Sequence, residues 1–234
     1  MMDEEAQATA ARLVRRLKGG YTVTIAESCT GGLLASTLTD IAGASAWFNQ
    51  SWVTHSYEAK IQELDVSREL LEKKGAVSAE VAIQMAQGAL ARANADIAIS
   101  ITGIAGPGND GSSKKIGYVY VGIASRTWAI AEATQIGGNR QENKEGFVHF
   151  ALLTAIRHWD QAMELAESNR LKDIEERETR AREEALAEIE RNKRAAAAAQ
   201  ETAWQSQTWS GDKQEGNGEG MGMDVTWNED SQED

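Results

Sequence analysis

The sequence has one cysteine, one proline and three histidines among its 234 residues. A single cysteine, Cys29, excludes a disulfide framework and a cysteine-based zinc cluster. His55, His149 and His158 lack the spacing of metal ligands, so we expect neither a metal site nor a cofactor. No uncharged run reaches the ~18 residues of a membrane span, and the N-terminus has no apolar signal core. We therefore expect a soluble cytoplasmic protein without a membrane partner.

Basic residues are also scarce, since 24 Lys and Arg stand against 36 Asp and Glu, for a net charge of −12. This balance argues against a nucleic-acid partner, because phosphate backbones require a basic surface. The excess is concentrated in residues 201–234, which hold nine acidic residues and one basic residue. The remaining 200 residues carry only −4, so the overall acidity says little against a small anionic ligand.

Composition divides the chain into three parts, with a folded domain at 1–162. Residues 163–200 are rich in Glu, Arg and Ala and predict a charged helix with a thin apolar stripe. A solvated single helix is favoured there over a self-pairing coil, because clean heptads are missing. Residues 201–234 have no helical or strand period, and we predict a disordered acidic tail. The tail is either a solubilising appendage or a docking segment for a protein partner.

Helix and strand patterns alternate in the first part. Helices are predicted at 4–18, 33–42, 58–64, 79–94 and 142–164, and strands at 21–26, 52–55, 96–101, 117–124 and 128–135. The last two strands are expected to form a hairpin. This order predicts an α/β fold with helices on both faces of a mostly parallel sheet. In such folds ligands bind at the carboxyl ends of the strands.

The loop at 28–32, Ser28-Cys29-Thr30-Gly31-Gly32, follows a strand and precedes a helix. A serine delivered to a tight turn beside helix amides is suited to act as a nucleophile. The alternative is that Ser28 caps the helix and the glycines form a plain phosphate loop. Cys29 is interpreted as a small buried residue, because no histidine is assigned to activate its thiol.

Two further loops fall at predicted strand ends. Lys60 could serve as the base for Ser28 if burial lowers its pKa, and Tyr57 lies three residues before it on the same helix face. The alternative for Lys60 is a solvated helix lysine. Residues 102–111 are rich in glycine and predict either a backbone-lined pocket or a surface turn. The loop lacks the G-K-[ST] of a Walker loop and the G-x-G-x-x-G fingerprint.

Four linked segments closely resemble one family. They are AESCTGGLLASTLTDIAGAS at 26–45, THSYEAK at 54–60, GAVSAEVAIQMAQGAL at 75–90 and ITGIAGP at 101–107. Together they resemble the C-terminal domain of the CinA family, which also occurs alone as a PncC-type nicotinamide-nucleotide amidase. The resemblance covers roughly residues 5–162. It implies a three-layer α/β/α sandwich and metal-free hydrolysis of nicotinamide mononucleotide (NMN) to nicotinate mononucleotide and ammonia, in pyridine-nucleotide (NAD) recycling.

The same resemblance assigns roles to residues. It makes Ser28 the nucleophile and Lys60 its base, with oxyanion donors among the amides near Thr30, Gly31 and Gly32. It makes Arg140 the candidate cation for the nucleotide phosphate. Three more residues are expected to line the pocket: Ser45, Tyr57 and Thr102. A homodimer is also compatible with the resemblance.

The chain departs from the family pattern at several positions. These are His55-Ser56-Tyr57, Asn139, Lys114-Lys115-Ile116-Gly117 and Gln50-Ser51. They affect the expected pocket shape and substrate affinity more than the reaction type. The preceding domain of whole CinA proteins is not found in this sequence, so we do not expect its pyrophosphatase-type activity. The alternative function is a non-catalytic nucleotide-binding domain with an acidic interaction tail.

Overall fold

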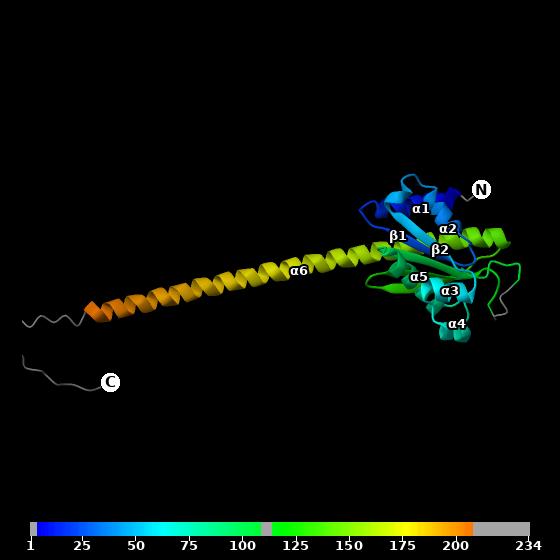
Figure 1. The fold of residues 1–234 in the computed structure, drawn as a ribbon. Coiled ribbons are helices and arrows are strands. Elements are labelled where there is room, and N and C mark those ends of the chain that lie inside the picture. Colours follow the sequence, from blue (N-terminus) through cyan, green and yellow to red (C-terminus); the bar gives the residue numbers. More distant parts are fainter. Residues whose placement is uncertain (1–3, 109–113, 208–234) are drawn as a thin grey trace, which may run out of the picture. The chain divides into compact units, whose positions relative to one another are not determined.

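A computed structural model describes residues 4–108 and 114–207 of the chain (Figure 1). The chain divides into two units, Met1–Asn169 and Arg170–Asp234. The predicted tail from residue 208 onward, and residues 109–111 of the glycine-rich loop, lie outside the described residues.

The first unit is built on a five-stranded sheet with the order β2-β1-β3-β4-β5. Its strands are β1 (Val23–Glu27), β2 (Phe48–Val53), β3 (Ile97–Gly103), β4 (Tyr118–Ser125) and β5 (Ala129–Gln135). Strand β1 pairs in parallel with β2 and β3, whereas β4 is antiparallel to β3 and to β5. The α/β class and the hairpin are confirmed. The sheet is mixed rather than mostly parallel, because the described residues after β3 and after β4 form no crossover helix.

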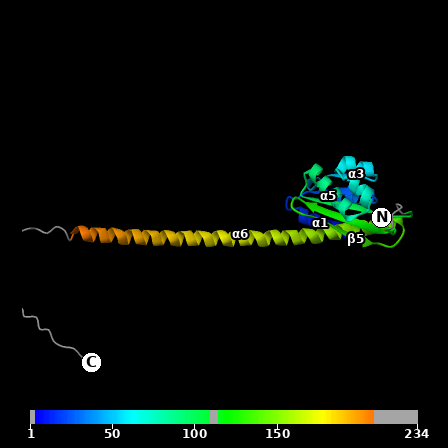
Figure 2. The same cartoon turned by 90° about the horizontal axis from the view of Figure 1, so that it is seen from below.

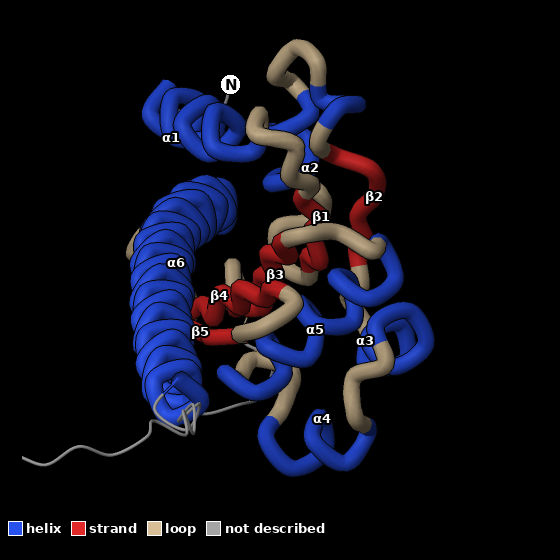
Figure 3. The backbone as a smooth tube through the Cα atoms, turned by 90° about the vertical axis from the view of Figure 1, so that its left-hand side faces the viewer, coloured by secondary structure: helices blue, strands red, loops and turns tan. Residues whose placement is uncertain are grey.

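Helices cover both faces of this sheet (Figure 3). They are α1 (Glu4–Leu17), α2 (Leu33–Thr39), α3 (Tyr57–Leu64), α4 (Arg68–Lys74), α5 (Ala79–Ala93) and α6 (Arg140–Gln207), with a 3₁₀ turn η1 at Ala44–Ala46. Sequence periodicity missed α4, which is short and buries only Leu71. Ser78 caps α5 as predicted, since its hydroxyl accepts from the Val81 amide.

Each face of the sheet has its own hydrophobic core. On one face, α1, α2 and the first part of α6 bury residues such as Leu13, Leu34 and Phe147 against Ile25 and the alternate residues of β3 and β4. On the other face, α3, α4 and α5 pack around a second cluster: Ala26, Leu64, Leu71, Met85 and Ala98. Helix α6 lies along β5 (Figures 2 and 3), and Glu132 of β5 pairs with Arg157 and His158. The arrangement is a three-layer α/β/α sandwich.

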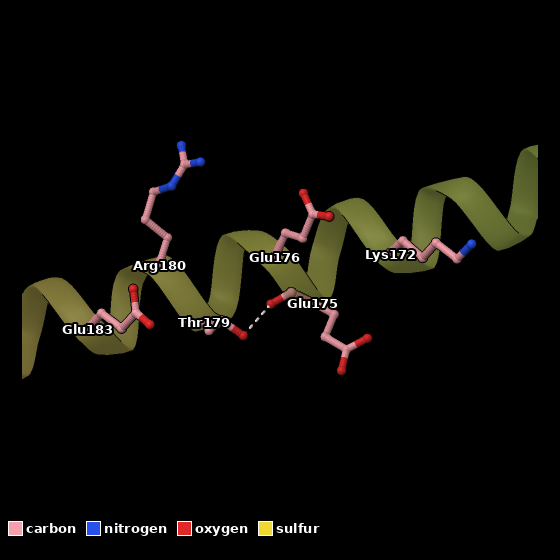
Figure 4. A pocket seen from close by; sticks show the side chains of 6 residues that line it. All are labelled: Lys172, Glu175, Glu176, Thr179, Arg180 and Glu183. Carbon is pink, nitrogen blue, oxygen red and sulfur yellow. Dashed lines mark hydrogen bonds between the residues drawn. The ribbon is translucent and has the colours of Figure 1, made fainter.

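Helix α6 includes both the closing helix and the charged extension expected from the sequence, so the charged helix is confirmed. It continues to Gln207, and residues 201–207, predicted to be disordered, are therefore helical. Alanine, glutamate and glutamine around residue 200 favour continuation of the helix. In the second unit, six polar side chains line a surface hollow on one face of this helix (Figure 4): Lys172, Glu175, Glu176, Thr179, Arg180 and Glu183. No described helix is both long and apolar enough to cross a membrane.

Candidate active site

The predicted loops meet at the carboxyl edge of the parallel strands. Strand β1 ends at Glu27, which is in register with Ile101 of β3 and Val53 of β2. The Ser28 amide donates to the Ile101 carbonyl at 3.0 Å, and the Thr54 amide donates to the Glu27 carbonyl at 2.8 Å. These two bonds continue the pairing of β1 with β3 and with β2 by one residue. They therefore fix the direction of the chain where the first two loops begin.

Ser28 and Lys60 are in direct contact. Lys60 Nζ lies 3.0 Å from Ser28 Oγ, and it also donates to the carbonyl oxygens of Thr54 at 2.7 Å and His55 at 3.2 Å. Lys60 lies on α3, and the Ser56 hydroxyl caps the first turn of this helix. Lys60 is fully buried and Ser28 nearly so. The structure therefore excludes the interpretation of Lys60 as a solvated helix lysine.

Burial lowers the pKa of Lys60 to about 8, because the charged ammonium loses water that the protein does not replace. The neighbouring Cys29 acts in the opposite direction and only partly offsets this effect. A lysine with this pKa is neutral in roughly one molecule in ten at pH 7. A neutral amine next to a serine hydroxyl has the chemistry of a general base.

Glu27 is a buried residue next to Ser28 that the sequence patterns did not single out. Its buried carboxylate accepts from the amides of Gly32 at 3.1 Å, Leu34 at 3.2 Å and Ala35 at 2.9 Å. These donors belong to the start of α2, so the protein's own anion satisfies them. The Gly32 amide, expected among the oxyanion donors, is already engaged. The signal for Glu27 in the sequence was an acidic residue directly before Ser28.

The rest of the turn that begins at Ser28 is tight. Gly31 adopts a φ of +66° and its amide donates to the Ser28 carbonyl at 3.3 Å. Thr30 is fully buried, and its hydroxyl has no hydrogen-bond partner within the described structure. Of the three residues expected near an oxyanion, Thr30 and Gly31 thus lie in the turn, and the buried Thr30 hydroxyl is unpaired within the described structure.

A cavity of about 200 Å³ opens beside this turn. It is lined by Cys29, His55, Gly103, Ile104, Ala105, Gly106, Gly108 and Arg140. Arg140 Nη1 donates to the Gly106 carbonyl, which brings the predicted phosphate cation to the glycine-rich loop. Burial raises the pKa of the Cys29 thiol to about 12, so the thiol beside Ser28 stays protonated at neutral pH.

Tyr57 and Thr102 do not point at the Ser28 hydroxyl. The Tyr57 hydroxyl accepts from the Ala76 amide at 3.3 Å, and the Thr102 hydroxyl donates to the Ala76 carbonyl at 2.8 Å. Both side chains therefore hold the turn before α5. Their contacts position backbone near the site rather than line the described cavity.

Ser45 is at the opposite edge of the sheet. It belongs to η1 and lines a separate hollow with Thr22 and Phe48, which precede or begin strands. The reason is topological: β1 and β2 are parallel, so the connection between them must return to the amino edge before β2 starts. Within this chain, Ser45 thus lines a different hollow from the cavity beside Ser28.

Asn139 departs from the family pattern, but the start of α6 remains capped. The Asn139 side chain accepts from the amides of Gln141 at 2.9 Å and Glu142 at 3.1 Å, while the Glu142 carboxylate accepts from the Asn139 amide at 2.7 Å. This reciprocal pairing is a capping box. One turn later, Asn143 is buried and donates to the carbonyls of Ala105 and Gly138, both at 3.1 Å. Asn143 thus fastens the pocket loop to α6, a contact that no local pattern predicts.

Three or more His, Cys, Asp or Glu side chains do not cluster as metal ligands anywhere in residues 4–108 and 114–207. Fold and site together define the class: an α/β protein with a buried Ser–Lys pair at the carboxyl edge of its parallel strands, beside a small cavity. The CinA C-terminal domain family matches residues 6–158. The chain therefore belongs to the CinA C-terminal domain family.

Individual relatives agree with this assignment. A nicotinamide-nucleotide amidohydrolase PncC from Escherichia coli is 42% identical over 166 residues, covering 70% of this chain and 99% of that protein. A CinA-like protein from Geotalea uraniireducens is 48% identical, over 53% of this chain and only 29% of that protein. Curated relatives of that kind are thus much longer than the part they share with this chain.

Solved structures resemble the first unit. The competence/damage inducible protein CihA from Agrobacterium tumefaciens matches with a TM-score of 0.64 and 38% identity, over 67% of this chain and 98% of that one. A CinA superfamily protein from Klebsiella pneumoniae matches with a TM-score of 0.64 and 34% identity, over 66% of this chain and 99% of that one.

Proposed function

We propose that the protein hydrolyses NMN to nicotinate mononucleotide and ammonia through an acyl-enzyme on Ser28. The observation that carries the proposal is the 3.0 Å contact between Lys60 Nζ and Ser28 Oγ in a buried site. The similarity to a protein named nicotinamide-nucleotide amidohydrolase supports the choice of substrate. The proposal places the reaction in cytoplasmic pyridine-nucleotide recycling.

The surroundings of Lys60 support its role as the base. A neutral lysine amine has two hydrogens and one lone pair. The carbonyls of Thr54 and His55 can accept both hydrogens, at 2.7 and 3.2 Å. The lone pair is then left for the Ser28 hydroxyl, from which it accepts a hydrogen bond and then the proton. Because these acceptors are backbone atoms, the His55 departure does not disturb them.

The reaction follows in two steps. Ser28 Oγ bonds to the carboxamide carbon as its proton passes to Lys60, and the tetrahedral oxyanion collapses with loss of ammonia, to which Lys60 returns the proton. Water then attacks the ester, Lys60 takes a proton from the water, and Ser28 leaves as a hydroxyl. An amide is a poor electrophile, so both an activated nucleophile and oxyanion donors are required.

The donors available to the oxyanion are limited by the geometry. The Gly31 amide already donates to the Ser28 carbonyl and the Gly32 amide to Glu27. We therefore assign the oxyanion to the neighbourhood of Thr30, with its unpaired hydroxyl as one donor. Arg140 lines the cavity and retains guanidinium hydrogens beyond its bond to Gly106, so we assign it to the phosphate. Tyr57 and Thr102 act through Ala76 as positioning residues.

The test is to supply purified full-length protein with NMN and to follow both products. We expect ammonia and nicotinate mononucleotide in equal amounts. The alternative, a non-catalytic nucleotide-binding domain, predicts that NMN raises the melting temperature and is recovered unchanged. Recovery of intact NMN from folded protein would overturn the proposed function.

A further inference from the structure

The turn after Ser28 faces a cation that the sequence motifs did not single out. A β-carbon at Gly31 would lie 3.9 Å from Lys144 Nζ, so the ammonium stands directly over this glycine. Gly31 has no side chain to separate the two, and it is exposed, whereas Ser28 is nearly buried. Lys144 therefore lies on the solvent side of the nucleophile turn.

Lys144 is available to a ligand. Its side chain has no salt bridge or hydrogen bond within the described part of the chain. The acidic residues next to it on α6 are engaged elsewhere: Glu142 accepts from the Asn139 amide, and Glu145 accepts from Gln141 at 2.7 Å. An unpaired ammonium over the turn that follows Ser28 is suited to bind an anion.

The backbone amides that usually bind an anion at a strand-to-helix turn are already occupied in this site. The amides that begin α2 donate to the Glu27 carboxylate, so a phosphate group cannot bind to them without displacing this buried anion. An anionic ligand must therefore find its partners among side chains. Arg140 lies four residues before Lys144, one helical turn away on the same face of α6, and lines the cavity.

We propose that Lys144 binds the 5′-phosphate of the nucleotide together with Arg140, and so selects nucleotides over nucleosides. This inference rests on the proposed function for the identity of the substrate. In NMN the carboxamide and the phosphate are at opposite ends, separated by the pyridine ring and the ribose. With the carboxamide at buried Ser28, the phosphate extends toward the exposed side, where Lys144 stands.

The experiment compares NMN with nicotinamide riboside, which lacks the phosphate. Binding is measured by calorimetry in a Ser28→Ala background, with Lys144→Gln, Lys144→Arg and, as a matched control on the same helix, Lys172→Gln (Figure 4). We expect Lys144→Gln to weaken NMN binding about 10- to 100-fold and to leave riboside binding unchanged. Lys144→Arg should recover most of the loss, and Lys172→Gln should match the parent.

Turnover by proteins that retain Ser28 separates this inference from the proposed function. Lys144→Gln should raise KM for NMN while kcat changes less than about threefold. If the parent hydrolyses NMN and Lys144→Gln shows the same KM, the inference fails and the function stands. If NMN binds in a Lys144-dependent way without being hydrolysed, the function fails and the inference stands. Equal losses for NMN and the riboside, or no binding of NMN, overturn the inference.

Discussion

Lys60 is the most informative single residue of the chain. Lys60 is the largest fully buried side chain among the described residues, and its ammonium has no carboxylate partner there. A buried charge without an opposite charge favours the neutral form, which is the form that can accept a proton. The cost of burying a lysine is thus coupled to the chemistry that we assign to it.

The lowered pKa of Lys60 gives a pH dependence of definite sign. Below a pH of about 8 the amine is protonated and cannot act as a base, so kcat/KM for NMN should rise with pH and level off above that value. Initial rates between pH 6 and 9.5 measure this. A profile that is flat or falls over this range contradicts the role of Lys60. Lys60→Arg, which stays charged throughout, should be inactive at every pH.

We expect Glu27 to affect stability and kcat through the turn that its carboxylate holds. Glu27→Gln keeps the size but replaces one of the two oxygens that accept from these three amides by an NH2 group, which cannot accept. We expect a loss of about 1–3 kcal/mol in the free energy of unfolding. Because the Ser28 turn loosens, kcat should fall more than KM rises. Glu58→Gln, at an exposed carboxylate on α3, is the matched control. An unchanged kcat in Glu27→Gln would show that this cap does not position the nucleophile.

At the residue scale, the sequence predicted Ser28 and Lys60 as a pair but did not single out Glu27 and Lys144. Ser28 and Lys60 lie in recognisable motifs, so their proximity could be expected. Glu27 and Lys144 could not be assigned in the same way. Their partners are backbone amides in a turn and a glycine more than a hundred residues away, and both depend on the folded geometry.

At the scale of elements, the packing of α3 on α5 positions Lys60. A β-carbon at Gly88 of α5 would lie 1.9 Å from the carbonyl oxygen of Leu64, the last residue of α3. Only glycine permits this approach, since backbone atoms cannot move as a side chain can. Leu64 and Lys60 are four residues apart and both are buried, so a displaced α3 would carry Lys60 away from Ser28.

Gly88→Ala should therefore impair both stability and activity. We expect a loss of about 1–3 kcal/mol in the free energy of unfolding, by overpacking, and a lower kcat/KM for NMN. Thermal denaturation and initial rates measure the two effects. Gly137→Ala is the control, because a β-carbon there would meet nothing within 4 Å. Parent-like stability of Gly88→Ala would contradict the close approach of the two helices.

The elements themselves and the β4–β5 hairpin were largely predictable, but the pairing of β3 with β4 was not. Helical and strand periods located most of them, whereas α4, with one fully buried residue, gave almost no periodic signal. Periodicity also does not report strand direction, so the antiparallel pairing of β4 with β3, which makes the sheet mixed, was not predicted. The position of Ser45 in a different hollow has the same origin, since nearness to Ser28 in sequence does not reveal the path of a crossover.

At the scale of the whole molecule, the candidate site lies entirely within the first unit. Ser28, Lys60, Arg140 and Lys144 all precede Asn169, where that unit ends. Residues 170–202 are all exposed along α6, and none of them belongs to either core. The charged extension should therefore be separable from catalysis.

A chain that ends at Asn169 should keep the kcat and KM of the full chain for NMN. Comparing the two proteins in the same assay measures this directly, and a large loss in the shorter chain would tie the extension to the enzyme. A pull-down with the full chain and with a chain lacking residues 201–234 tests whether the acidic tail binds a protein partner. Identical captured proteins would leave the tail as a solubilising appendage.

The central claim is that the hydroxyl of Ser28 performs the chemistry. Its most direct test is the rate of ammonia release from NMN by Ser28→Ala, compared with Ser36→Ala, which changes an exposed serine on α2. With both variants shown to be folded by circular dichroism, we predict at least ~1,000-fold loss for Ser28→Ala and a parent-like rate for Ser36→Ala. Ammonia release by folded Ser28→Ala at the rate of the parent would contradict the account.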